Sequence, residues 1–149
     1  MQVKIYEQLE VIFASAGFTV NPDGADIRSI DTLPAVWFTF PDDEMESAVE
    51  DEKQEVGHLI NEWEFIFNIM VKSTRDNYRI ECLKVITILK KLIYDNRQIH
   101  SVADGCLARK WEYLSSEIVN FRENRHASGG VSLNTLVTYS QYRDDPSNN

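Results

Sequence analysis

The feature that most constrains the fold is a long amphipathic stretch in the middle of the chain, Asp76 to Asn96. Its apolar side chains recur at intervals of three and four residues, and charged residues fall mostly between them. The apolar residues are Ile80, Cys82, Leu83, Val85, Ile86, Leu89, Leu92 and Ile93. This spacing predicts a helix that ends at Asn96 and is capped by Ser73, Thr74 or Asp76. Its apolar stripe needs a surface to cover, and the rest of the chain predicts a β-sheet.

Two elements are expected before this helix. Residues 3–16 have helical periodicity, and Gly17 is well placed to end that helix. Residues 18–32 are turn-rich and predict an irregular connector. Residues 33–40 predict a strand with two largely apolar faces, so we expect both faces to be covered. One cover would be the helices of the same domain, and the other could be a neighbouring subunit.

Three further segments have strand patterns. Residues 61–71 alternate strictly between apolar and mostly polar positions, which is typical of an antiparallel sheet with one wet face. Residues 109–121 have a mixed pattern that predicts a bulge or a shift of partner near Ser115 and Ser116. Residues 131–142 alternate again, and Gly129 and Gly130 before them predict a turn.

The order helix-strand-strand-helix-strand-strand predicts an α+β fold. We expect an antiparallel four-stranded sheet with the helices packed on one face. The length fits a single domain over residues 1–143, followed by a polar tail, 144–149.

The net charge of −9 argues against tight, sequence-independent binding of DNA or RNA, which needs clustered lysine and arginine. Two cysteines are present, and Cys82 lies on the apolar helix face, so we expect a buried free thiol. The N-terminal residues lack the apolar core of a signal peptide, and no apolar run approaches a membrane span. A cytoplasm-like compartment and no membrane contact are therefore expected.

Residues 42–56 carry eight acids and one lysine. The acids are Asp42, Asp43, Glu44, Glu46, Glu50, Asp51, Glu52 and Glu55. One interpretation is a solvated loop between two strands. The other is a functional loop that faces a partner or a DNA-containing lumen and keeps the polyanion at a distance.

No arrangement of residues predicts catalysis, a cofactor or a metal site. His58, His100 and His126 are far apart, and none has a second ligand at helical spacing. Asp42 followed by Asp51, Glu52 and Lys53 matches a nuclease signature by letter. That chemistry requires the second carboxylate and the lysine on an apolar strand, whereas here they lie in a charged run. We therefore expect no enzyme.

The three tryptophans lie on predicted strands, where burial in the core is the simplest interpretation. Trp is also favoured at subunit interfaces. The candidates for a subunit or partner interface are Val36, Trp37, Phe38 and Trp111.

In its order of elements the chain resembles the tail terminator, or tail completion, proteins of long-tailed bacteriophages. The similar segments are VKIYEQLEVIFASAG, LPAVWFTF, NEWEFIFNIMV, DNYRIECLKVITILKKLIYDN, WEYLSSEIVNF and VSLNTLVTYSQY, and together they span roughly residues 1–143. The acidic segment and the mixed strand 109–121 fit that family only loosely.

The resemblance implies a structural virion protein of the tail, assembled in the host cytoplasm. Such proteins form a ring, commonly a hexamer, that caps the tail tube, stops its polymerisation and provides the surface for head attachment. The implied partners are further copies of the chain, the tail tube protein and the head completion or connector protein. DNA would pass through the lumen without specific binding. The alternatives are a head–tail joining (neck) protein of the same fold and a small acidic assembly chaperone or adaptor.

Overall fold

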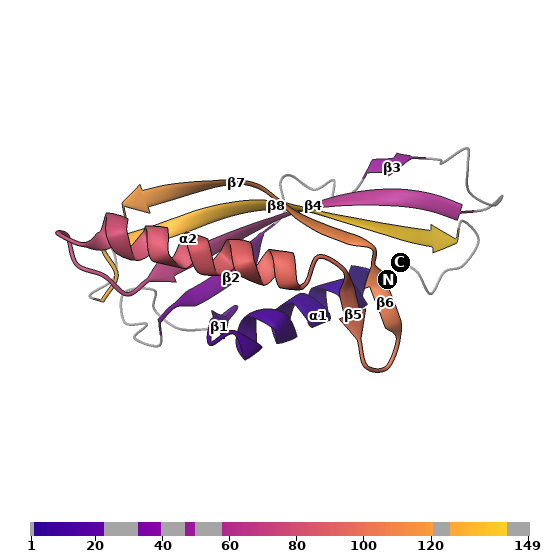
Figure 1. The fold of residues 1–149 in the computed structure, drawn as a ribbon, viewed down its shortest axis with the longest axis horizontal. Helices are drawn as coiled ribbons and strands as arrows, with labels where there is room; N and C mark the ends of the chain where they lie inside the picture. The colour runs from indigo at the N-terminus through magenta and orange to yellow at the C-terminus, as the bar shows by residue number, and fades with distance from the viewer. Residues whose placement is uncertain (1, 23–32, 40–46, 50–57, 121–125, 143–149) are drawn as a thin grey trace.

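The structure is a computed structural model and describes residues 2–22, 33–39, 47–49, 58–120 and 126–142. This part of the chain forms two helices and eight strands (Figure 1). They are α1 (Gln2–Ser15), β1 (Thr19–Val20), β2 (Ala35–Thr39), β3 (Ser47–Val49), β4 (His58–Val71), α2 (Tyr78–Asp95), β5 (Ile99–Ser101), β6 (Gly105–Ala108), β7 (Lys110–Asn120) and β8 (Gly129–Tyr142).

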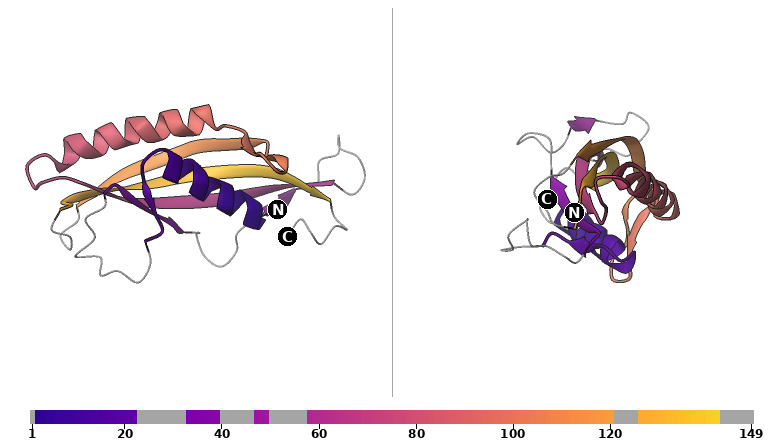
Figure 2. Two further views of the ribbon diagram at one scale, coloured as in Figure 1. Left: turned by 90° about the horizontal axis from the view of Figure 1, so that it is seen from below. Right: turned by 90° about the vertical axis from the view of Figure 1, so that its left-hand side faces the viewer.

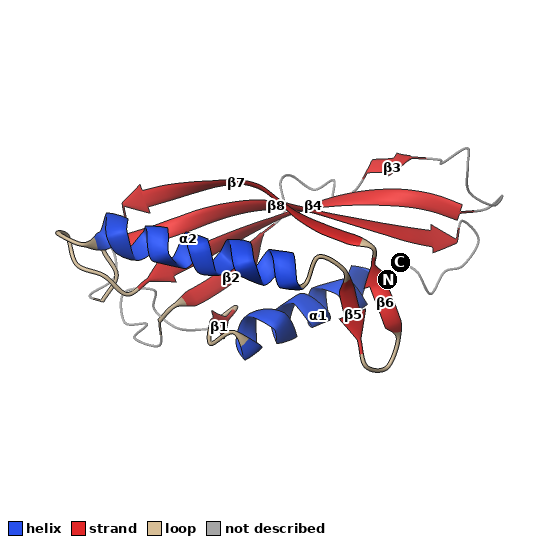
Figure 3. Cartoon of the chain, viewed as in Figure 1, coloured by secondary structure: helices blue, strands red, loops and turns tan. Residues whose placement is uncertain are grey.

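The fold is α+β, but the predicted antiparallel four-stranded sheet is wrong. The main sheet has six strands: five follow the order β1-β2-β4-β8-β7, and β3 pairs with β4 beside this path. It is mixed, because β1 and β2 are parallel. The strands β5 and β6 form a separate two-stranded sheet (Figure 3). The predicted element order is also wrong, since it omits β1, β3, β5 and β6.

The omitted strands are too short for a periodic pattern. β1 has two residues and lies in the stretch expected to be an irregular connector. β3 has three residues and lies inside the acidic run, which has no strand periodicity. Both depend on a longer neighbour: β1 pairs with β2, and β3 pairs with β4. Tertiary pairing rather than local sequence therefore defines them.

The long strands β4 and β8 form the centre of the sheet and pair over their full length, from His58–Tyr142 to Val71–Gly129. Both helices pack on one face of this pair (Figure 2). From α1, the ring of Phe13 packs against that of Phe67 in β4 at a tilt of 41°, with ring centroids 4.8 Å apart. From α2, Leu89 is fully buried in the same core.

The first helix ends as the sequence predicts. Gly17 has φ of 94° and donates its amide to the carbonyl of Ala14, while the Phe18 amide reaches the carbonyl of Phe13. These two hydrogen bonds form a Schellman motif, in which glycine readily adopts the left-handed conformation. The Phe13 and Phe18 rings also pack edge to face at 5.5 Å. Gly17 is thus confirmed as the helix stop.

The central helix differs from its prediction in its N-cap and in the width of its buried apolar stripe. Asn96 is its C-cap, as predicted, but its N-cap is Asn77 rather than Ser73, Thr74 or Asp76. Its buried residues are Cys82, Val85, Ile86, Leu89 and Ile93. Ile80 and Leu83, which were expected in the buried stripe, are exposed. The stripe predicted from helical spacing was too wide, because the spacing shows which residues share a side of the helix but not how much of that side the sheet covers.

Gly129 and Gly130 are the first residues of β8 rather than a turn. A Cβ atom on Gly129 would lie 2.7 Å from Tyr78 Cδ2, and one on Gly130 would lie 2.6 Å from the carbonyl oxygen of Ile69. The two glycines therefore allow α2 and β4 to approach β8 closely.

The bulge predicted in the strand 109–121 is confirmed. The register of β7 against β8 shifts between Tyr113 and Ser115. Before the shift, Trp111 pairs with Val137 on the helix-covered face, and after it Ile118 pairs with Val131 on that face. One extra residue thus keeps apolar residues of opposite phase in the same core.

Candidate functional site

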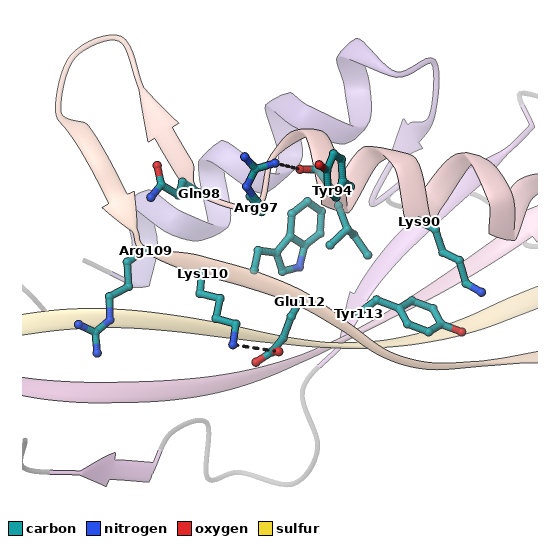
Figure 4. A pocket seen from close by; sticks show the side chains of 10 residues that line it. Lys90, Tyr94, Arg97, Gln98, Arg109, Lys110, Glu112 and Tyr113 are labelled. Carbon is teal, nitrogen blue, oxygen red and sulfur yellow. Dashed lines mark hydrogen bonds and ion pairs between the residues drawn. The ribbon is translucent and has the colours of Figure 1, made fainter.

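Four basic side chains line a cleft of about 500 Å³ at one edge of the sheet (Figure 4). The cleft lies between the C-terminal end of α2 and the beginning of β7. It is lined by Lys90, Ile93, Tyr94, Arg97, Gln98, Arg109, Lys110, Trp111, Glu112 and Tyr113. We call this surface the basic cleft.

A backbone contact holds the two walls of the basic cleft together. Where α2 ends, the carbonyl of Arg97 accepts a hydrogen bond from the amide of Trp111 at 2.8 Å. The β5–β6 hairpin connects these two points, so residues 97–98 return to lie beside 109–113. On the other side, the amide of Arg109 donates to the carbonyl of Thr138 at 3.1 Å. Residues remote in sequence are thereby fixed around one cleft.

Aromatic rings hold two of the four cations without neutralising them. The Arg97 guanidinium lies 4.9 Å from the centre of the Tyr94 ring, and the Lys90 ammonium lies 4.9 Å from that of Tyr113. Such contacts are attractive and leave the positive charge available to an anion. Figure 4 shows the side chains of Lys90, Tyr94, Arg97 and Tyr113 on the α2 side of β7, whereas those of Arg109, Lys110 and Glu112 extend from the other side of this strand.

The basic cleft is electrostatically distinct from the rest of the chain. Four basic side chains line it against one acid, Glu112, which gives a formal charge of +3. Lys110 forms an ion pair with Glu112 at 3.3 Å, whereas Arg97 and Lys90 contact aromatic rings. Because the whole chain carries −9, the remainder carries −12. Arginine and lysine beside tyrosine rings suit an anionic ligand such as carboxylates.

The structure places three of the four predicted interface residues inside the core. Val36, Phe38 and Trp111 lie on the helix-covered face and are buried within the chain. Trp37 lies on the opposite face of β2 and is half-buried. Its Nε1 points to the carbonyl of Pro22 at 3.4 Å. Of the four, Trp37 alone therefore offers surface to a partner.

Trp37 borders a second, apolar hollow of about 400 Å³ on the helix-free face. Met70 and Val119 also line it. Ala35, Met70, Gly130 and Val119 follow one another across four neighbouring strands. Since Gly130 has no side chain, the row is open between Met70 and Val119. A neighbouring subunit, which we expected as the second cover of β2, would have to pack on the face that carries this hollow.

The acidic residues of the predicted partner-facing loop lie outside the described residues. These are Asp42, Asp43, Glu44, Glu46, Glu50, Asp51, Glu52 and Glu55, and the nuclease-like letters fall on the same stretch. The structure does describe Ser47–Val49 between them. These residues form β3, which pairs with β4 at the sheet edge opposite to β7.

The basic cleft could not be predicted from the sequence. Lys90 lies on the predicted helix, Arg97 in the expected loop, and Arg109 and Lys110 at the start of a predicted strand. The one available signal is that the positive residues at 97 and 109–110 flank the same loop, within an otherwise acidic chain. The β5–β6 hairpin was not predicted, and without it the sequence does not indicate that the two ends of that loop lie side by side.

In the ranges that the structure covers, His, Cys, Asp and Glu side chains do not gather in groups of three or more that would hold a metal ion. Neither α1 nor α2 has the length and apolar character to cross a membrane. Comparison with protein families and with curated proteins finds no match for this chain.

Proposed function

We propose that this chain is a structural protein of a phage tail, a tail terminator whose copies form a ring. The ring would cap the tail tube, stop its polymerisation and provide the surface for head attachment. The proposal combines the resemblance in the order of the six longer elements, α1, β2, β4, α2, β7 and β8, with one structural observation, an apolar surface on the outer side of α2.

The outer side of α2 carries large apolar residues that are exposed in the described part of the chain. Ile80, Leu83, Ile88 and Tyr94 are exposed by 59%, 56%, 51% and 67%. We call these four residues the outer apolar face. A helix on a protein surface normally presents polar residues to solvent, so four large exposed apolar side chains on α2 are unusual. The outer apolar face therefore favours a protein that assembles with further chains.

The energetic benefit of covering this face is substantial. Fully burying one large apolar side chain contributes roughly 1.5–3 kcal/mol. Lys84 and Lys91 lie among these residues and are exposed, so an interface here would have a polar rim beside its apolar centre. That composition is typical of subunit interfaces.

The test is the length of tail tubes formed in vitro by the tail tube protein encoded in the same genome. Adding the wild-type chain is expected to halt tube growth, so electron microscopy should find tubes that are shorter and capped at one end. Leu83→Glu should lose this effect, because it puts a charge into the outer apolar face. Tubes of unchanged length at an excess of folded wild-type chain would rule out the terminator function.

Val102→Glu is the matched control. Val102 is fully exposed at the tip of the β5–β6 hairpin, away from the outer apolar face. It undergoes the same change from an apolar to an acidic side chain, and it should halt tube growth like the wild type. Loss of activity in both variants would assign the effect to net charge rather than to α2.

A further inference from the structure

We propose that the basic cleft receives the acidic segment 42–56 of a neighbouring copy of this chain. The inference rests on the self-assembly in the proposed function and names one of its contacts. It joins copies head to tail, with the cleft of one copy filled by the acidic segment of the next.

Charge complementarity identifies the occupant. The basic cleft carries a formal charge of +3, and segment 42–56 carries eight acids and one lysine, hence −7. Arginine and lysine in a partly enclosed cleft bind carboxylates through charge-assisted hydrogen bonds. Arg109 is exposed, and in the described part of the chain the Arg97 guanidinium contacts the ring and the backbone carbonyl of Tyr94, so both guanidinium groups can donate hydrogen bonds to a carboxylate.

The sheet topology places the two complementary features on opposite edges. Ser47 of β3 pairs with Glu62, Glu62 pairs with Thr138, and Thr138 pairs with Lys110 of the cleft. Three strand spacings of about 4.8 Å separate the ends of this row, or about 14 Å. The middle of the acidic segment, β3, therefore lies at one edge of the sheet. The basic cleft lies at the opposite edge, which β7 forms. This arrangement favours a contact between two copies over one within a single copy.

A contact between two different surfaces of the same chain is heterologous. Such contacts produce a ring when the rotation between copies closes, and a filament when it does not. Tyr94 belongs both to the basic cleft and to the outer apolar face. A neighbour seated in the cleft would therefore begin to cover the outer apolar face as well.

A nucleic acid is the competing occupant, since phosphates also bind arginine and lysine. The rest of the chain, however, carries −12, and this charge repels a long polyanion. The acidic segment of a neighbouring copy is short, and assembly through the outer apolar face would already hold it near the cleft. The acidic segment is therefore the occupant that we infer.

The direct test measures binding of a fluorescein-labelled peptide of residues 42–56 to the full chain by fluorescence anisotropy. The inference predicts saturable binding that weakens as salt is added. The double variant Arg109→Glu with Lys110→Glu should weaken binding by about tenfold or more. A peptide with every acid replaced by its amide should not bind. Equal binding of the acidic peptide to wild type and double variant would overturn the inference.

The matched control is the double variant Arg75→Glu with Arg79→Glu. Both arginines are exposed near the beginning of α2, outside the basic cleft, and the change in net charge is the same. This control should bind the peptide almost as the wild type does. If it loses binding as strongly as the cleft variant, the attraction is a general effect of net charge and the inference fails.

Mixing two variants separates contacts between copies from contacts within one. The cleft variant and a segment variant, Asp51→Lys with Glu52→Lys, should each assemble poorly. Their mixture should recover part of the assembly, because the lysines of one meet the glutamates of the other. No recovery, or binding of a short DNA duplex that the cleft variant abolishes, would contradict the inference. If the wild type assembles through this contact but does not halt tube growth, the terminator function fails while the inference about the cleft stands.

Discussion

Trp111 donates a hydrogen bond from its indole Nε1 to the hydroxyl oxygen of Thr135 at 3.1 Å. The Thr135 hydroxyl in turn donates to the backbone carbonyl of Phe65 at 3.2 Å. All three residues are buried, so this relay crosses β7, β8 and β4 inside the core. It explains how a tryptophan that the sequence marks as a candidate interface residue is satisfied within its own chain.

Replacing Thr135 by valine should destabilise the fold by about 1–3 kcal/mol. Valine has nearly the same shape, but it leaves the indole N–H of Trp111 buried without its acceptor. Urea unfolding followed by tryptophan fluorescence measures this change in the free energy of unfolding. Thr138→Val is the control on the half-exposed face of the same strand, and it should change stability much less. Equal effects at both positions would contradict the relay.

Ser73 joins the end of β4 to the beginning of β8. Its hydroxyl donates to the carbonyl of Val71 at 2.8 Å and accepts from the amides of Ser128 and Gly129, both at 3.1 Å. Ser73→Ala leaves two amides without this acceptor, so we expect a loss of about 1–3 kcal/mol in the free energy of unfolding. Ser132→Ala, at a half-buried position on β8, should remain within about 0.5 kcal/mol of the wild type. A loss at Ser73 no larger than at Ser132 would refute this role.

The two cysteines should differ strongly in reactivity. The structure confirms that Cys82 is a buried free thiol, whereas Cys106 is exposed. Burial, and to a smaller extent Glu81, raises the pKa of Cys82 from 9.0 to about 11. In the native protein Ellman's reagent should therefore modify Cys106 quickly and Cys82 only on unfolding. Equally fast reaction of two thiols per native chain would contradict the burial of Cys82.

The raised pKa of Cys82 also has a consequence for stability. Between pH 9 and about 11 the thiol ionises in the unfolded chain but stays protonated in the folded one. The unfolded state then binds fewer protons, so stability falls as the pH rises through this window and is fully present below it. Cys82→Ala should show a shallower decline than the wild type in urea titrations across the same range. Parallel declines would show that other groups account for the pH dependence.

Gly130→Ala should be more damaging than Gly129→Ala. The new Cβ at residue 130 would meet the carbonyl oxygen of Ile69 at 2.6 Å, and backbone in the centre of a sheet cannot move easily. At residue 129 the nearest atoms belong to the side chains of Tyr78 and Cys82, and Tyr78 is only half-buried. We expect a loss of about 1–3 kcal/mol for Gly130→Ala. Thermal unfolding of both variants measures it, and the reverse ranking would contradict the packing described.

The elements that the sequence predicts well are those with long periodic patterns. The helix around Leu89 and the strands around Phe67 and Val137 each repeat an apolar position many times, so their type is clear. The bulge beside Leu114 was also predictable, because apolar residues change phase there. The strand order was not, since β1 and β3 are too short to carry a pattern and form only where a longer strand supplies the partner.

The basic cleft was beyond sequence analysis for a related reason. Arg97 and Trp111 are neighbours because the Arg97 carbonyl accepts a hydrogen bond from the Trp111 amide after the β5–β6 hairpin reverses the chain. No local pattern encodes that return. The exposure of Ile80 and Leu83 was equally hidden, because helical spacing shows which residues share a side but does not set the width of the surface that covers them.

The central claim is that the outer apolar face of α2 drives assembly of this chain. The most direct test is absolute mass by light scattering on a sizing column, over a range of concentrations, for wild type, Leu83→Glu and Val102→Glu. The account predicts a species several times the single-chain mass of 17.2 kDa, about six chains for a closed ring, in the wild type and in Val102→Glu. Leu83→Glu should shift to the single-chain mass. A wild-type protein that stays at the single-chain mass at every concentration would contradict the claim and favour a monomeric adaptor.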